Sequence, residues 1–306
     1  MTPAGKSHGP SRALLGTLLT AVSTLTIGCE RPAATPAGGL ARYDLSGAPS
    51  LRVTLPAELR EVSGLAVDST GRLFAHGDEE GRVFEIEPST GKVLKSFALA
   101  PGATQMDLGK KPKDGVVAGD FEDLAIAGGR FFMVTSGGVL LEFGEGEDGT
   151  QVPFTVHPTG LGETCEVEGL AHDPASQSLL LLCKEMREES QRDRLEIFGW
   201  PLRDQRLEER PRSVTTFSAL APVTGAKEFN GSALAIVPGG RSLAIVAGPQ
   251  RLFAEVAPDG KPLGGGALQR EGLPQPEGMA FLPDGTLLIS SEGGKGEATV
   301  SAYRPQ

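Results

Sequence analysis

Five copies of one six-residue pattern occur in the chain, and this repetition constrains the fold more than any other feature. Each copy begins with an oxygen-bearing side chain, has Leu or Met at its fifth position and ends in Ala. Successive copies start 59, 46, 64 and 45 residues apart. Such spacing is typical of the four-stranded blades of a β-propeller. The copies are Glu61–Ala66, Asp120–Ala125, Glu166–Ala171, Asn230–Ala235 and Gln275–Ala280.

The segments after each copy have the pattern of short strands separated by turns that contain Gly. The last copy is followed by too few strands for a blade, whereas Leu51–Leu55 alternates apolar and polar residues ahead of the first copy. We therefore predict an all-β, five-bladed β-propeller whose ring is closed by this N-terminal strand in the last blade. A six-bladed ring is the alternative, if the connector 101–119 or 218–229 contains strands.

The N-terminal residues have the features of an export signal. Lys6 and Arg12 precede an apolar stretch of 15 residues at 13–27, which is too short for a stable transmembrane helix. The following Gly28-Cys29 step resembles the bacterial lipoprotein lipobox, although Thr26 stands where that pattern usually has Leu. The resemblance implies lipidation of Cys29. An ordinary secretory signal with an incidental cysteine is the alternative.

These features predict three parts of the chain. They are a lipoprotein signal peptide at 1–28, a lipidated Cys with a flexible tether rich in Pro, Ala and Gly at 29–48, and a propeller domain at 49–306. The protein would be exported and lipid-anchored to the cell envelope, with the membrane as the partner of its N-terminus. Glu30, rather than Asp, after the cysteine favours a location at the outer membrane or in the periplasm, with display on either side of that membrane left open.

The charge balance argues against nucleic acid as a partner. The net charge is −10 and the pI is near 5.0, so the chain lacks the basic field that binds phosphate backbones. An acidic excess suits cations, although it can also serve solubility alone.

The first and third positions of the repeat supply candidate metal ligands. Residues two apart in an extended strand point the same way, so these positions should meet at one mouth of the central channel. Such a ring of oxygen donors suits Ca²⁺ better than Mg²⁺, which needs tighter octahedral geometry. The alternative role is structural, with the side chains accepting hydrogen bonds from a neighbouring blade. The candidates are Glu61, Asp120, Glu122, Glu166, Glu168, Asn230 and Glu277.

The long connections should lie on the same face as this ring. They are 101–119, 185–194 and 218–229. Asp78 and Glu292, each at the end of a second strand, should approach the same mouth. Variable loops on a rigid scaffold commonly form the binding face, so we expect an unidentified ligand or protein partner there. The charged run 184–193 is interpreted as a solvated loop.

Two cysteines bracket a predicted hairpin. Cys165 precedes the first strand of the third repeat and Cys183 ends its second strand, with the turn near 174–177. Antiparallel pairing would bring the two together, and an exported protein permits a disulfide. Two free buried thiols are the alternative.

Catalytic patterns are sparse. Outside the expected signal peptide, where Gly5–Gly9 matches by sequence, the chain has no Gly-x-Ser-x-Gly motif, and none of His76, His157 and His172 lies beside an obvious nucleophile. We expect His172 to be a core residue. His76, two residues from Asp78, is the histidine to test as an acid–base group.

The repeats resemble those of the SdiA-regulated family of exported calcium-binding propellers. This resemblance rests on Glu61–Ala66, Asp120–Ala125 and Pro276–Ala280, together with the segment Asp284–Glu292, and it covers about residues 50–304. It implies a propeller that binds calcium outside the cytoplasm.

The repeats are more distantly similar to NHL repeats and to gluconolactonase/SMP-30 propellers. The latter similarity implies a catalytic divalent metal held by a Glu, an Asn and an Asp. Glu168 or Glu277 would match the Glu and Asn230 the Asn, whereas the Asp has no clear counterpart.

Two functions from different classes follow. The first is a non-enzymatic binding or interaction propeller with Ca²⁺ at the channel mouth, favoured by the acidic ring and the lack of a nucleophile–base pair. The second is a metal-dependent hydrolase of lactones or phosphate esters acting at the same mouth. A scaffold without metal is a further alternative.

Overall fold

The structure is a computed structural model that describes Gly9 and residues 39–101, 108, 110–111, 115–239 and 242–306. The expected lipidation site Cys29 and, except for Gly9, the expected signal peptide lie outside the described residues. In the part of the chain that is described, no helix is both long enough and apolar enough to cross a bilayer.

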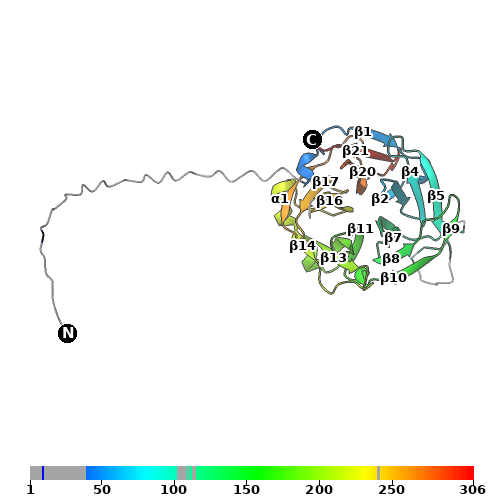
Figure 1. The fold of residues 1–306 in the computed structure, drawn as a ribbon, viewed down its shortest axis with the longest axis horizontal. Coiled ribbons are helices and arrows are strands. Elements are labelled where there is room, and N and C mark those ends of the chain that lie inside the picture. The colour runs from blue at the N-terminus through cyan, green and yellow to red at the C-terminus, as the bar shows by residue number, and fades with distance from the viewer. Residues whose placement is uncertain (1–8, 10–38, 102–107, 109, 112–114, 240–241) are drawn as a thin grey trace. The chain divides into compact units, whose positions relative to one another are not determined.

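Strands dominate the described residues and form five sheets arranged as the blades of a ring (Figure 1). The predicted five-bladed β-propeller is confirmed. The strands of each blade are given from the inner to the outer one. Blade one is β2 (Val62–Val67), β3 (Leu73–Gly77), β4 (Arg82–Ile86) and β5 (Val93–Leu99); blade two is β6 (Phe121–Ala127), β7 (Arg130–Thr135), β8 (Val139–Phe143) and β10 (Phe154–Pro158); and blade three is β11 (Cys165–Asp173), β12 (Ser178–Met186), β13 (Arg194–Pro201) and β14 (Ser213–Thr216). Blade four is β15 (Ala233–Ile236), β16 (Leu243–Ala247), β17 (Leu252–Val256) and β18 (Pro262–Ala267), and blade five is β19 (Pro276–Phe281), β20 (Leu287–Ser291), β21 (Thr299–Tyr303) and β1 (Leu51–Thr54).

The ring is closed by both ends of the propeller. Strand β1 pairs antiparallel with β21, with Val53 opposite Val300, so the last blade has the N-terminal strand that the repeats predicted. The connector 218–229 carries most of helix α1 (Phe217–Thr224) rather than strands. The described part of 101–119 contains no strand, only the isolated bridge residues Val116 and Ala118, the latter paired with Glu80. The six-bladed alternative therefore finds no support.

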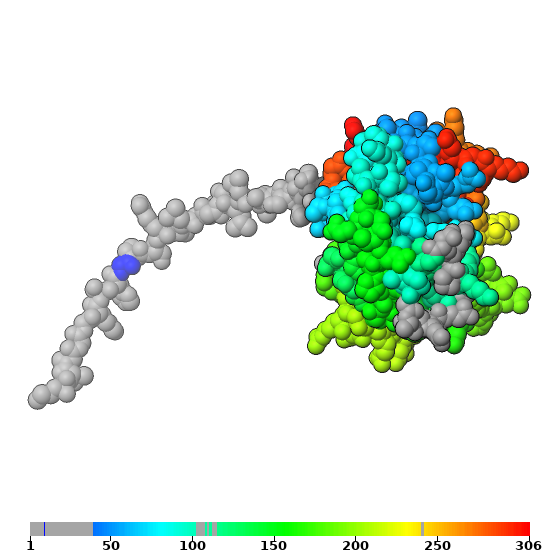
Figure 2. Space-filling model, turned by 90° about the vertical axis from the view of Figure 1, so that its right-hand side faces the viewer, coloured from blue at the N-terminus to red at the C-terminus, as the bar shows by residue number. Residues whose placement is uncertain are grey.

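Strand β9 (Gln151–Val152) was not expected from the sequence. It lies in the second repeat but pairs in parallel with β5, as a fifth strand of the first blade. Figure 2 shows the outer surfaces of these two blades, in cyan and green, lying against each other.

The apolar core is divided into five clusters, one between each pair of neighbouring blades. Successive side chains of a strand point to opposite faces of its sheet. Leu65 accordingly packs between blades five and one, and Ala66 between blades one and two. Glycine at the fourth position lets the next inner strand approach, since a Cβ on Gly278 would lie 3.0 Å from the backbone nitrogen of Leu65. The repeat thus encodes blade-to-blade packing.

The third position of the repeat is a β-bulge. The pairing register shifts around Ser63, Glu122, Glu168 and Glu277. A bulge leaves one residue unpaired and re-aims its side chain. The simple two-residue alternation assumed from the sequence therefore does not hold at these positions.

Residues 39–48, expected in the flexible tether, pack onto the propeller. Leu40, Tyr43 and Leu45 are buried in the cluster between blades four and five. The backbone N–H of Leu40 donates to Glu255 at 2.7 Å, and the Tyr43 hydroxyl donates to the carbonyl of Gly285 at 2.6 Å. The described residues 39–48 therefore belong with the propeller, because these apolar side chains fill the groove between two blades.

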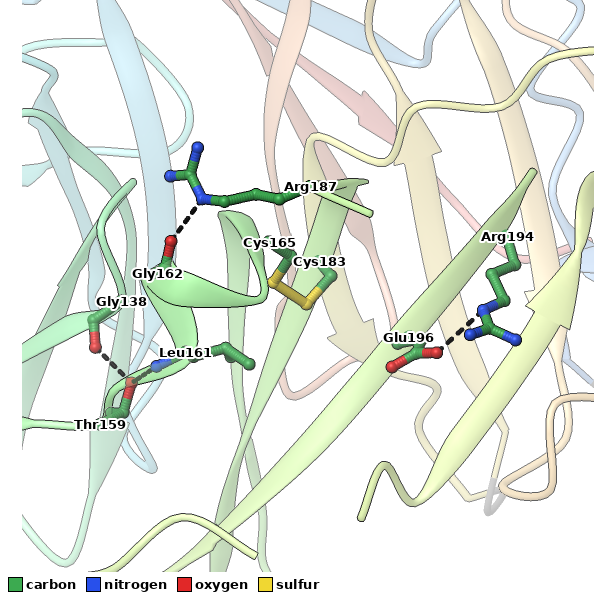
Figure 3. Close-up of a disulfide and its surroundings, with 9 residues drawn as sticks. All are labelled: Gly138, Thr159, Leu161, Gly162, Cys165, Cys183, Arg187, Arg194 and Glu196. Atoms are coloured by element: carbon green, nitrogen blue, oxygen red, sulfur yellow. Dashed lines mark hydrogen bonds and ion pairs between the residues drawn. A yellow bond between two sulfur atoms is a disulfide. The ribbon is translucent and has the colours of Figure 1, made fainter. Parts of the chain in front are cut away.

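Cys165 and Cys183 form a disulfide between β11 and β12 (Figure 3). Their Cα atoms are 5.6 Å apart and both residues are fully buried. The pairing is the one expected from the hairpin, rather than two free thiols. Beside it, the Arg187 side chain donates to the carbonyl of Gly162, which ties the loop after β12 to the turn before β11.

Candidate functional site

The acidic mouth is the end of the channel where the five inner strands begin. Six carboxylates from the repeat are placed there, and their charges act on one another. The bulged Glu122 and Glu168 lie at the centre of one group, and the bulged Glu277 connects that group to a second. These six are Glu61, Asp120, Glu122, Glu166, Glu168 and Glu277.

Lys184 lies inside the first group, although the sequence interpretation placed it in a solvated loop. It belongs to β12, and its ammonium is 2.7 Å from Oε1 of Glu168 and 3.6 Å from Oε1 of Glu166. Desolvation lowers the pKa of Lys184, but the surrounding carboxylates outweigh it and raise that pKa to about 12. The protein therefore supplies its own cation between blades two and three.

Burial and mutual repulsion raise the pKa values of Glu122 and Glu168 in this first group. Burial, with added repulsion from Glu168 and Asp120, raises the pKa of Glu122 to about 9. Burial also raises the pKa of Glu168, and the Lys184 ammonium opposes that rise. Glu122 therefore holds a proton more readily than Glu168, whose carboxylate has the Lys184 ammonium at 2.7 Å.

A second group of carboxylates joins blades one and five. Burial first, and then the charges of Glu277, Asp78 and Glu61, raise the pKa of Glu292 to about 7. Burial and the Glu61 charge likewise raise the pKa of Asp78, and the charge of Lys110 opposes this rise. Among the described residues, no basic side chain forms an ion pair with any of the four carboxylates Glu61, Asp78, Glu277 and Glu292. We call Glu61, Asp78, Glu277 and Glu292 the blade one–five carboxylates.

The remaining candidates have protein partners. Asn230 exchanges two hydrogen bonds with Gln250, at 3.1 and 2.6 Å, so both its backbone N–H and its side-chain oxygen are engaged. Asp120 accepts from the Ser136 hydroxyl at 2.6 Å and lies 3.5 Å from the ammonium of Lys110. These two residues take part in local structure at the rim.

Asp123, at the fourth repeat position, was missed by the sequence analysis. It is 1% exposed, and its carboxylate accepts the N–H groups of Leu124 at 2.8 Å and Leu170 at 2.7 Å. Leu170 belongs to the next blade, so Asp123 has the stapling role considered for the first and third positions. The available signal was a charged residue at a position that is Gly or Ala in the other copies.

His76 cannot serve as an acid–base group at the mouth, contrary to the expectation from the sequence. It is fully buried, and its Nδ1 donates to the carbonyl of Gly77 at 2.8 Å. Burial lowers the pKa of His76 to about 4, so the ring is neutral. The reason is its place in β3, where every residue except Gly77 is buried.

The two halves of the mouth fit a divalent cation differently. Oxygen donors are what Ca²⁺ requires, and the blade one–five carboxylates supply them with no ammonium of the described lysines in contact. Beside Glu122, Glu166 and Glu168 the ammonium of Lys184 already holds the position of a cation. Within the described residues no three His, Cys, Asp or Glu side chains are arranged as a finished metal site, so an ion would have to draw the carboxylates together.

Comparison with known proteins identifies the fold but no family. No protein-family model matches this chain, and no curated protein matches it in sequence. In structure it is similar to the PQQ-bound aldose sugar dehydrogenase from Streptomyces coelicolor, at 11% identity, 85% coverage of this chain, 100% coverage of that chain and a TM-score of 0.54. It is also similar to glutaminyl cyclase from Myxococcus xanthus, at 12% identity, 84% and 97% coverage and a TM-score of 0.50. Likeness at this identity shows the fold alone: the chain is a β-propeller.

Proposed function

We propose that the protein is a non-enzymatic binding propeller of the cell envelope whose acidic mouth takes a divalent cation, Ca²⁺. The observation that carries this proposal is the clustering of the blade one–five carboxylates, none of which forms an ion pair with a basic side chain that the structure describes. Partly buried like charges raise one another's pKa values and are stabilised by a bound cation. Ca²⁺ suits this group better than Mg²⁺ because it accepts six to eight oxygens in loose geometry.

The resemblance to the SdiA-regulated family agrees with a calcium-binding propeller outside the cytoplasm. Anchoring at the outer membrane through a lipidated Cys29 belongs to the same proposal. The disulfide supports export, because such bonds persist in oxidising compartments. A Cys29→Ala variant should move the protein from the membrane fraction to the soluble fraction of cells, and an unchanged distribution would reject the anchor.

Calorimetry with Ca²⁺ or EDTA tests the cation site. Ligand at a hundred times its Kd stabilises a protein by about 2.7 kcal/mol, which for a domain of this size corresponds to a rise in Tm of roughly 5 °C or more. Glu292→Gln should reduce this rise, while Glu228→Gln, at an exposed position outside the blade one–five carboxylates, should keep it. Equal Tm values in Ca²⁺ and EDTA would remove the metal from the proposal.

Hydrolysis of lactones or phosphate esters has less support, because Asn230 is bonded to Gln250 and Glu168 is paired with Lys184. Screening both substrate classes would settle the point. Turnover that disappears in both Glu168→Gln and Glu277→Gln would replace the binding function with an enzymatic one.

A further inference from the structure

The end of the channel opposite the acidic mouth contains a cavity of about 480 Å³, which we call the basal cavity. Its wall is made by the residue that follows the repeat in each of the five inner strands. All five of these side chains are only partly buried, although four of them are apolar. They are Val67, Ile126, His172, Ile236 and Phe281.

The inner end of the basal cavity is also apolar. It is formed by the fifth repeat position, where none of the five residues is more than 4% exposed. Turns between the first and second strands, including Pro174, Pro238 and Pro283, surround the opening. All five blades therefore contribute to one concave site on the face opposite the carboxylates.

Among the residues that the structure describes, the lining carries almost no available charge. Asp68 is the one acidic residue of this described lining, and its carboxylate already accepts from the Thr70 hydroxyl at 2.7 Å and the Arg72 side chain at 2.8 Å. Burial lowers the pKa of His172, which keeps the imidazole neutral at physiological pH. A charged ligand would lose hydration here without gaining a counter-ion from the described lining.

We propose that the basal cavity binds a small, uncharged, hydrocarbon-rich molecule. Its volume falls in the range of ligand pockets, roughly 300–1,000 Å³, and its lining has the expected predominance of apolar side chains. Turns from several blades surround the opening, which favours a small molecule over a protein segment. The site is separate from the acidic mouth and does not depend on the function proposed there.

Titration of the full chain with 2-naphthol, followed by fluorescence, tests this site. Saturable binding with one molecule per chain is expected. Ile126→Trp fills the cavity from blade two and should weaken binding at least tenfold, and Ile236→Trp does the same from blade four in case the first variant does not fold. Leu94→Trp is the matched control, because Leu94 lies on an outer strand and is 51% exposed; it should leave the affinity unchanged.

Charged analogues separate the basal cavity from the acidic mouth. 2-Naphthoate should bind at least tenfold more weakly than 2-naphthol. A 2-naphthylmethylammonium probe that loses affinity in Glu292→Gln but not in Ile126→Trp would report the mouth instead. Absence of saturable 2-naphthol binding, or binding unaffected by folded Ile126→Trp and Ile236→Trp variants, would overturn the proposal.

Discussion

Lys184 controls the charge of one half of the acidic mouth. The Glu168 side chain is 6% exposed and has the ammonium of Lys184 at 2.7 Å. Lys184→Met would leave that carboxylate buried without its counter-ion. Losing one partner of a buried pair costs about 3–5 kcal/mol, and because Lys184 is 25% exposed we expect roughly 2 kcal/mol less unfolding free energy, allowing for solvent screening.

Urea denaturation at pH 7 would measure this loss. Lys227→Met, at an exposed position, should change stability little. The double variant Lys184→Met/Glu168→Gln should recover much of the loss, since no unpaired charge remains. Equal stabilities of wild type and Lys184→Met would mean that the ion pair contributes nothing.

At the residue scale the sequence predicted which side chains gather at the mouth but not how they are neutralised. Glu122, Glu168 and Glu277 follow from the repeat. Lys184 lies on a second strand, outside the repeat, and only the pairing of β12 with β11 brings it to Glu168. Asp123 was passed over because its partner, the N–H of Leu170, belongs to another blade. Contacts between repeats cannot be obtained from one repeat.

Blades one and two are joined by a group of ions, in which Arg72 and Lys95 of blade one contact Glu145, after β8 of blade two. Arg72 holds Glu145 by two hydrogen bonds of 2.7 and 2.9 Å, and the Lys95 ammonium contacts the same carboxylate. Because the hydrogen bonds from Arg72 and Lys95 outweigh desolvation, the pKa of Glu145 falls to about 2. A lowered folded-state pKa stabilises the protein above the ordinary value of 4.5 and ceases to do so as the pH falls toward 2.

Glu145→Gln should therefore cost about 1 kcal/mol at pH 7, as expected for a partly exposed network. The difference from wild type should shrink between pH 4.5 and 2, because wild-type Glu145 then takes up its proton. Urea midpoints at pH 7, 4 and 3 would show this, with Glu147→Gln as the control on the same loop. A difference that stays constant with pH would argue against the ionic explanation.

At the scale of elements, strands were predictable and their irregularities were not. Alternation and turn residues indicated the hairpins, because backbone pairing and burial impose a period of two. The bulges at Glu122, Glu168 and Glu277 add a residue without altering that local pattern. Strand β9 escaped prediction for a different reason, since it pairs with a blade that its own repeat does not form.

At the scale of the whole molecule, the number of blades followed from counting repeats, and ring closure followed from the strand missing in the last one. The packing of 39–48 was not predictable in the same way. Its Gly- and Pro-rich neighbourhood indicates a tether, yet Leu40, Tyr43 and Leu45 find a groove that exists only after blades four and five have formed.

Ring closure should make the propeller depend on β1. Val53 and Leu55 belong to the cluster between blades five and one, and β1 covers the edge of β21. A chain of residues 56–306 should lose several kcal/mol of core packing, which lowers Tm by roughly 10 °C, and its uncovered edge should promote association. A chain of residues 49–306, which keeps β1 and also lacks the packed segment 39–48, is the matched control. Calorimetry and light scattering of the two chains would measure both effects. If 56–306 stays monomeric and unfolds at the same temperature as 49–306, closure by β1 does not hold the ring together, and the five interfaces between blades must be sufficient by themselves.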